Sequence, residues 1–293
     1  MRKLNFILYM KKKPVSGIRR RAPVVSGIFY PEIRENIARR LAEWSLKEGS
    51  ACPAFGGQAI VAPHGAWELT GNIAASAFAA IQGQKEKSGY QVRRVILLGK
   101  HHHSSEEGIY LSESSSFETP LGDIPVDKKL NQQLASCSTM IRVNDIPHLS
   151  EHSLEVHLPF VKYCFPAAKI VPILMSGSRP IFVTGLAKAL RIILEDYIEE
   201  SLVIISSNVS QNMDPADALS MANEFTSLLE NTDSSAFLGS LAAGRISASA
   251  GALLGAFIES GLLNGKHFSA LCPLAQDKGE KGETVYYGAF AAI

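Results

Sequence analysis

Short apolar runs alternate with longer amphipathic segments along most of the chain. Four of the runs are rich in β-branched residues and have the length of single strands: Gln58–Ala62, Arg94–Leu98, Lys169–Leu174 and Leu202–Ile205. Five segments with the period of an amphipathic helix lie around and between them: 33–47, 71–81, 153–163, 182–198 and 215–229. This alternation predicts an α/β fold with a central, mostly parallel sheet and helices on both of its faces.

Single residues refine two of these elements. The first helix is predicted to have one apolar stripe, formed by Ile33, Ile37, Leu41 and Trp44. Pro172 lies inside the third predicted strand. Because proline has no N–H to donate, that strand is expected at an edge of the sheet or with a bulge.

The C-terminal third of the chain adds further elements. Asp214 is predicted to cap the helix that follows it. Two helices rich in small residues are expected at 236–243 and 251–261, and a final strand at 284–293. No internal repeat, low-complexity linker or change in composition divides the sequence. We therefore expect a single domain over residues 21–293.

The composition agrees with a folded domain and argues against several other classes of protein. With 46% apolar and 19% charged residues among 293, the chain is not expected to be disordered. Its 29 Lys and Arg residues balance 28 Asp and Glu residues, so the net charge of +1 gives no reason to expect binding to nucleic acid or to a membrane surface. No apolar stretch reaches the ~20 residues of a membrane span.

Residues 1–20 are expected to form a basic, flexible extension. The short apolar run at 4–10 is followed by three lysines, and no cleavage site of a secretory signal is clear. The four cysteines, Cys272 among them, are far apart and form no CxxC pair, so reduced thiols are expected. These features favour a cytoplasmic protein.

Polar side chains follow three of the predicted strands. The first strand runs into His64, the second into His101–His103 and the fourth into Ser206–Asn208. In an open α/β sheet the ligand site lies beyond the carboxyl ends of the parallel strands. We therefore expect His64 and one of the three consecutive histidines to converge at this edge.

Two imidazoles need a third donor to hold a divalent ion. A carboxylate as the third donor would favour non-haem Fe(II), whereas a thiolate would also suit copper or zinc. The candidate donors further along the chain are Glu151, His152, Glu155, His157 and Cys272.

Each candidate also has an ordinary structural interpretation. Three adjacent histidines are typical of a polar turn, and His64 can equally well bond to backbone carbonyls. Glu151 and Glu155 lie where a helix N-terminus is expected and would then interact with its dipole, which leaves the nearby histidines in structural or orienting roles. Cys272 alone is equally consistent with an inert thiol.

Common catalytic motifs are absent from the sequence. GxGxxG and GxxxxGK[ST] do not occur, so dinucleotide binding and P-loop phosphate binding have no support. HExxH and GxSxG do not occur either. The histidines at the strand ends remain the best candidates for chemistry.

Five segments of the chain match the motifs of one known family in the same order. They read RAPVVSGIFYP (21–31), IVAPH (60–64), LLGKHHH (97–103), FETPLG (117–122) and EHSLEVHLPF (151–160). The chain thereby resembles the Memo family, protein B of the AmmeMemoRadiSam system, which is related in fold to the class III extradiol dioxygenases. The resemblance covers roughly residues 21 to 293 and implies that fold for this chain.

The resemblance also implies a metal site that holds Fe(II) or Cu. The two metal-binding histidines of the family correspond to His64 and His102. The family's third ligand, a cysteine in some members, is best matched by Cys272. His103 and His152 would line or orient the site.

Several positions depart from the family pattern, among them the turn after His64, where the family's Ala-Gly is Gly65-Ala66. After its fourth strand the family commonly reads SSDxxH, whereas this chain has Asn208 and Gln211 in place of the acid and the histidine. An amide does not change protonation state near neutral pH, so both are taken as binding residues and no catalytic residue is assigned. Lys100 lies within the motif that reads LGPSHH in the family and adds a positive charge beside the predicted cation site.

Two interpretations of function follow. In the first, the chain is a Memo-like protein whose cleft, at the carboxyl edge of the sheet, holds a degenerate metal site; it is then a non-catalytic binding or partner protein, or a weak redox-metal protein. In the second, it is an active non-haem Fe(II) dioxygenase or another metal-dependent oxidoreductase acting on a small molecule. The resemblance implies an AMMECR-type protein and a radical SAM protein as partners.

Overall fold

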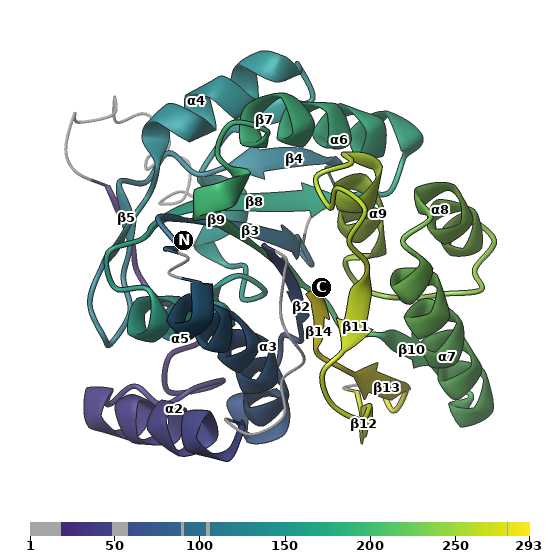
Figure 1. The fold of residues 1–293 in the computed structure, drawn as a ribbon, viewed down its shortest axis with the longest axis horizontal. Helices are drawn as coiled ribbons and strands as arrows, with labels where there is room; N and C mark the ends of the chain where they lie inside the picture. The colour runs from purple at the N-terminus through teal and green to yellow at the C-terminus, as the bar shows by residue number, and fades with distance from the viewer. Residues whose placement is uncertain (1–18, 49–57, 89–90, 104–105, 280) are drawn as a thin grey trace, which may run out of the picture.

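An eight-stranded sheet forms the centre of the molecule (Figure 1). The computed structural model describes residues 19–48, 58–88, 91–103, 106–279 and 281–293, so residues 1–18 of the expected extension lie outside the described residues. The strand order is β11–β14–β2–β9–β3–β8–β4–β7. The bounds are β2 (Ala59–Ala62), β3 (Arg94–Lys100), β4 (Gly108–Leu111), β7 (Ile141–Val143), β8 (Lys169–Ser176), β9 (Ser201–Ser206), β11 (Phe268–Ala270) and β14 (Phe290–Ala292).

The four middle strands, β2, β9, β3 and β8, run parallel to one another. Leu98 of β3 lies opposite Ile205 of β9 on one side and Ile173 of β8 on the other, so the carboxyl ends of these strands meet at one edge. β14 and β4 flank the four strands in antiparallel orientation. The predicted α/β domain with a mostly parallel sheet is confirmed.

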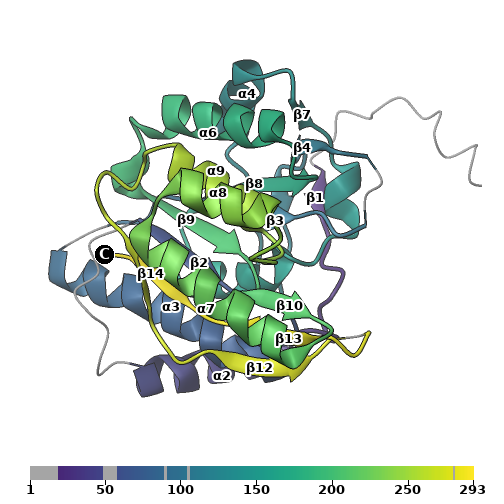
Figure 2. The ribbon, with the colours of Figure 1, turned by 90° about the vertical axis from the view of Figure 1, so that its right-hand side faces the viewer.

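Helices cover both faces of this sheet, as predicted (Figures 1 and 2). On one face lie α2 (Arg34–Glu48), α3 (Trp67–Ser88) and α5 (Leu158–Cys164). On the other lie α4 (Lys128–Cys137), α6 (Pro180–Leu194), α7 (Pro215–Asn231), α8 (Ser234–Ala242) and α9 (Gly251–Glu259). Successive residues of a strand point to opposite faces, so Leu97 of β3 packs in the first core and Leu98 in the second.

The predicted helices are present, with changes at their ends. Asp214 caps α7 as predicted, because its side chain accepts hydrogen bonds from the N–H groups of Ala216 and Asp217. The predicted stripe of the first helix is only partly buried, since Ile37 is inaccessible whereas Ile33 is 53% exposed. The predicted helix at 153–163 is the 3-10 turn η3 (Glu155–His157) followed by α5.

Two further 3-10 turns are η2 (Ile146–Leu149) and η4 (Ile198–Glu200). No helix within the described residues is long and apolar enough to cross a membrane.

The expectation for Pro172 is wrong, because β8 lies inside the sheet between β3 and β4. The pairing of β8 with β4 ends at Ile173, and the next contact on that side is the bridge between Ile170 and Val126. Pro172 lies in the gap between these contacts. Its missing N–H therefore leaves no hydrogen bond of β4 unmade.

The predicted final strand at 284–293 is two strands in different sheets. β13 (Thr284–Tyr287) pairs with β10 (Ser210–Asn212) and β12 (Ala275–Lys278), whereas β14 joins the central sheet. Gly288 lies between them in a crowded turn, where an added Cβ would come within 2.7 Å of Leu274. A third small sheet contains β1 (Arg20–Arg21), β5 (Ser116–Phe117) and β6 (Ile124–Pro125).

Candidate metal centre

Three histidines meet at the carboxyl edge of the sheet. His64 follows β2, His102 follows β3, and His152 comes from the segment between η2 and η3. One potential ligand atom of each lies within 4.8 Å of the other two. The ring centroids are 5.0 Å apart for His64 and His102, 4.9 Å for His102 and His152, and 5.7 Å for His64 and His152. We call these three residues the histidine cluster.

A buried carboxylate orients the His102 ring. Glu151 Oε1 lies 2.9 Å from His102 Nδ1, and Glu151 Oε2 accepts the backbone N–H of His102 at 2.7 Å. Burial by itself raises the pKa of Glu151, but the hydrogen bonds from His102 and from the backbone of Ser153 outweigh it and hold this pKa far below its usual value. The ionised carboxylate only accepts, so His102 Nδ1 donates this hydrogen bond and Nε2 is the ring nitrogen left for a ligand.

The hydroxyl group of Ser206, the last residue of β9, fixes which nitrogen of His64 is protonated. Ser206 Oγ lies 2.7 Å from the backbone oxygen of Ser153, which can only accept, so the hydroxyl donates its single proton there. The same Oγ lies 3.1 Å from His64 Nδ1 and 3.0 Å from His157 Nε2, and it has to accept from both. His64 is therefore protonated on Nδ1, and its Nε2 is free.

The third ring, that of His152, lies beside the same carboxylate as the His102 ring, at a longer distance. His152 Nδ1 lies 3.4 Å from Glu151 Oε1, and the edge of the ring contacts Phe29, with the centroids 5.2 Å apart. All three rings thus have Nδ1 beside an oxygen of the surrounding protein. This is the arrangement in which proteins orient histidines that bind a metal through Nε2.

The cluster is electrostatically suited to a cation. Burial, together with the neighbouring His102 and His152 rings, lowers the pKa of His64 well below its usual value, and burial also lowers the pKa of His152. The rings of His64 and His152 are therefore neutral near neutral pH, as metal ligation requires. With metal–nitrogen bonds of about 2.0–2.1 Å, the nitrogens of a tetrahedral site lie about 3.3–3.4 Å apart, so the three rings would move closer together to share one ion.

The other residues expected at the site lie elsewhere or at its rim. Cys272 lies in the loop between β11 and β12, partly buried against the core below α2 and α3, and is not part of the histidine cluster. His103 is exposed, with its ring 6.5 Å from that of His152. His101 is buried against Tyr110 instead of facing the cluster residues.

The two amides at the family's acid and histidine positions bond to each other. Asn208 Nδ2 donates to Gln211 Oε1 at 3.1 Å. Asn208 Oδ1 accepts the backbone N–H of Ser249 at 2.7 Å, which ties the end of β9 to the loop before α9. The Asn208 amide is thus engaged in the loop structure.

The sequence pattern did not indicate which residues hydrogen-bond to the histidine rings. Ser206, which bonds to two histidines, gave no signal beyond its place after an apolar strand. Glu151 and Glu155 do not interact with a helix N-terminus as expected, because Glu151 bonds to His102. Glu155 instead forms a buried ion pair with Arg21 and accepts the Tyr30 hydroxyl at 3.0 Å.

Comparisons with known proteins identify relatives of the chain. The family model described as Memo-like protein matches residues 21–248. A MEMO1 family protein of Pyrobaculum aerophilum is 29% identical over 214 residues, which cover 71% of this chain and 74% of the relative. A MEMO1 family protein of Thermotoga petrophila is 25% identical over 223 residues, which cover 73% of this chain and 78% of the relative.

One solved structure also has a similar fold. An uncharacterized protein of Escherichia coli K12 superposes with a TM-score of 0.51 at 12% sequence identity, and the match covers 80% of this chain and 99% of that protein. At this identity the likeness concerns the fold alone.

Proposed function

Because the chain belongs to the family of Memo-like proteins, we propose that it binds one transition-metal ion through His64, His102 and His152. The proposal rests on which ring nitrogens of the histidines are already hydrogen-bonded within the protein. The hydrogen bonds of Ser206 and Glu151 occupy Nδ1 of His64 and His102, which leaves Nε2 of both rings free in a cluster of three imidazoles. Three imidazoles suit Fe(II), Cu and Zn, and the family resemblance favours Fe(II) or Cu.

Within this proposal His152 is the third ligand in place of Cys272. His152 belongs to the cluster, and its Nδ1 lies beside the same carboxylate that orients His102. A bound ion would supply a Lewis acid or a redox centre. The residues around it would hold the rings, fix their protonation and keep water from the buried side of the site, where His157 and Ser206 are fully buried.

Metal titration of the purified protein tests the proposal. Fe(II) under anaerobic conditions, Cu and Zn are each added to metal-free protein, and the bound metal is counted after desalting. We expect about one ion per chain, and loss of most of the bound metal in His64→Ala, His102→Ala and His152→Ala. His267→Ala, which removes an exposed histidine before β11, is the matched control and should bind like the wild type.

Two outcomes would revise the proposal. Equal, low occupancy in the wild type and in all the cluster variants would exclude the metal site. A loss in Cys272→Ser as large as that in His64→Ala, with His152→Ala unaffected, would restore the cysteine as the third ligand.

An active Fe(II) dioxygenase is the second candidate, and the amide pair argues against it. Proton abstraction from a catechol-type substrate needs a group that titrates, and Asn208 and Gln211 do not. We expect no ring-opened product when the Fe(II)-loaded protein is incubated with catechols in air. Formation of the coloured cleavage product would favour the enzyme.

Family membership also supports partners of the AmmeMemoRadiSam system. We propose that the chain acts with an AMMECR-type protein and a radical SAM protein as a binding component. Size-exclusion chromatography of the three proteins from one genome tests this: a shared peak is expected, and three independent elution volumes would contradict it.

A further inference from the structure

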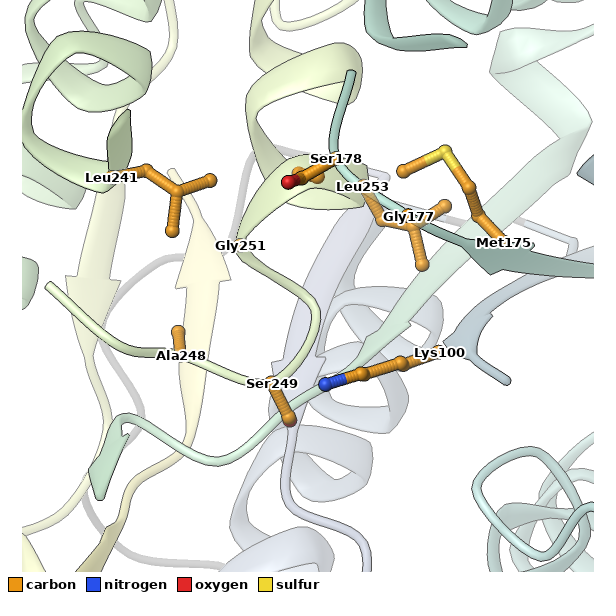
Figure 3. A pocket seen from close by; sticks show the side chains of 10 residues that line it. Lys100, Met175, Gly177, Ser178, Leu241, Ala248, Ser249, Gly251 and Leu253 are labelled. Atoms are coloured by element: carbon orange, nitrogen blue, oxygen red, sulfur yellow. The ribbon is translucent and has the colours of Figure 1, made fainter. Parts of the chain in front are cut away.

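A cavity of about 310 Å³ opens beyond the ends of β3 and β8, between these strands and the start of α9 (Figure 3). Lys100 and Met175 line it from the strands, Leu241 from the end of α8, and Ser249 and Leu253 from around the start of α9. This volume is within the range of small-molecule sites in proteins. We call it the Lys100 cavity.

Lys100 brings a positive charge into the cavity without a counter-charge. Figure 3 shows its side chain extending toward Ser249. Among the described residues, neither a hydrogen bond nor an ion pair engages its ammonium group, and the residues that line the cavity include no carboxylate. Glu107, which packs beside Gly177 at the cavity wall, is itself paired with Arg179 at 2.6 Å. A partly buried ammonium without a partner is a strong hydrogen-bond donor for an anion.

Apolar side chains form part of the remaining lining. Met175, Leu241 and Leu253 line the cavity, and of these Met175 and Leu253 are almost inaccessible to solvent. A second cavity of about 220 Å³ shares Ser178 and Leu241 with the first and continues along apolar side chains of α6 and α8. An inorganic anion would occupy only the part next to Lys100, whereas an anion on an apolar carbon skeleton would also contact the apolar side chains of the second cavity.

Hydrogen bonds connect the lining of the Lys100 cavity to the residues around the histidine cluster. Ser249 in the cavity bonds to Asn208, which is two positions after Ser206, and Ser206 contacts His64. On the other side, the backbone oxygen of Lys100 accepts a hydrogen bond from Ser153 at 2.9 Å, next to His152 in the chain. A ligand in this cavity therefore lies beside the cluster.

We propose that the Lys100 cavity binds a small organic acid, with its carboxylate at Lys100 and its apolar body against Leu241 and the apolar side chains of the second cavity. The acid would be the small-molecule ligand of the same site, and in that respect the inference rests on the proposed metal-binding function. Its recognition involves none of the metal ligands, so the two can be tested apart.

The test compares an acid with its uncharged amide. Binding of 3-phenylpropionate and of 3-phenylpropionamide to metal-free wild-type protein is measured by calorimetry and by ligand-observed NMR, with acetate as the anion that lacks an apolar body. We expect 3-phenylpropionate to bind about tenfold or more tightly than either of the other two, because a charge-assisted hydrogen bond and apolar burial both contribute.

Substitutions assign that preference to the lysine. Lys100→Met keeps the length of the side chain and removes the charge, so it should lower the affinity for the acid about tenfold and leave the affinity for the amide unchanged. Lys100→Arg should retain most of the preference. Lys169→Met removes an exposed lysine at the opposite end of the neighbouring strand β8 and should behave like the wild type. Circular dichroism confirms that each variant is folded.

Several results would overturn the proposal. These are no binding of the acid at millimolar concentration, equal binding of acid and amide, or an unchanged preference in Lys100→Met. Repeating the titration with His102→Ala separates this failure from that of the metal site. Retained acid binding with no metal supports the cavity alone, and metal binding with no acid preference leaves only the metal site.

Discussion

Glu151 and Glu155 lie in the same buried segment, and the structure gives them different partners. Glu151 binds His102 and lies beside His152, so it belongs to the second layer of the histidine cluster. Glu155 binds Arg21, the N–H groups of Val24 and Val25, and the Tyr30 hydroxyl, so it anchors the N-terminal part of the domain. Both carboxylates are almost inaccessible to solvent.

The difference shows what a buried charge is for in each place. Both carboxylate oxygens of Glu155 accept hydrogen bonds from groups of the protein, one of which is the positively charged Arg21. Neither of the side-chain partners, Arg21 and Tyr30, has a further atom that is available to a ligand, because both are almost inaccessible to solvent. At Glu151 the bonds orient rings whose second nitrogen remains free. The sequence motif that contains both residues therefore has two roles: Glu155 stabilises the fold, and Glu151 holds a proposed metal ligand. Substitutions of each residue can measure the two roles separately.

The largest expected effect is on stability, from Glu155→Gln. This change leaves the buried guanidinium of Arg21 without its charged partner and should lower the free energy of unfolding by about 3–5 kcal/mol. Urea denaturation measures it. Glu68→Gln is the control: it breaks the exposed pair between Glu68 and Arg40 and should cost less than about 1 kcal/mol. Equal losses in the two variants would show that the buried pair is not an anchor.

Glu151→Gln should act on metal affinity. The amide still reaches His102 but no longer carries the charge that makes its ring a better ligand, so the affinity for the metal should fall about 10- to 100-fold with the stoichiometry retained. Competition with a chelator measures the change. If Glu155→Gln, where folded, lowers metal affinity as much as Glu151→Gln does, the proposed division between the two carboxylates is wrong.

The sequence was informative about strands and about the residues that follow them, for a physical reason. A buried parallel strand needs a continuous β-branched run, and parallel strands place their carboxyl ends at one edge, which predicted that His64 and one of His101–His103 would be close. The family resemblance pointed to His102 among the three. The position of His152 depends on how a loop outside the sheet packs, and no local pattern reports that. Pro172 misled because its effect depends on where β4 stops pairing.

A histidine outside the cluster gives a third prediction. His148 is fully buried near Phe117, and burial lowers its pKa from 6.5 to about 4. Below pH 6.5 the unfolded chain therefore binds a proton here that the folded chain does not bind until about pH 4. Its contribution to stability is present above pH 6.5 and is lost as the pH falls, at up to about 1.4 kcal/mol per pH unit.

His148→Gln should make stability less dependent on pH in this range. Urea midpoints of the metal-free protein between pH 7 and pH 5 measure the slope, and the variant should show a slope smaller by about one proton. His267→Ala, which removes an exposed histidine, should leave the slope close to that of the wild type. An unchanged slope in His148→Gln would mean that this histidine is protonated in the folded state.

The smallest expected effect is that of a Lys100 substitution on the free energy of unfolding. Arg21 has a buried partner, whereas the ammonium of Lys100 has no bonding partner within the described residues. Lys100→Met should therefore change the free energy of unfolding by less than about 0.5 kcal/mol, because no interaction of the ammonium group is lost. A loss of several kcal/mol in urea denaturation would show that Lys100 is structural. A near-zero change in the free energy of unfolding, together with the loss of acid binding, would mean that the charge of Lys100 binds a ligand and does not stabilise the fold.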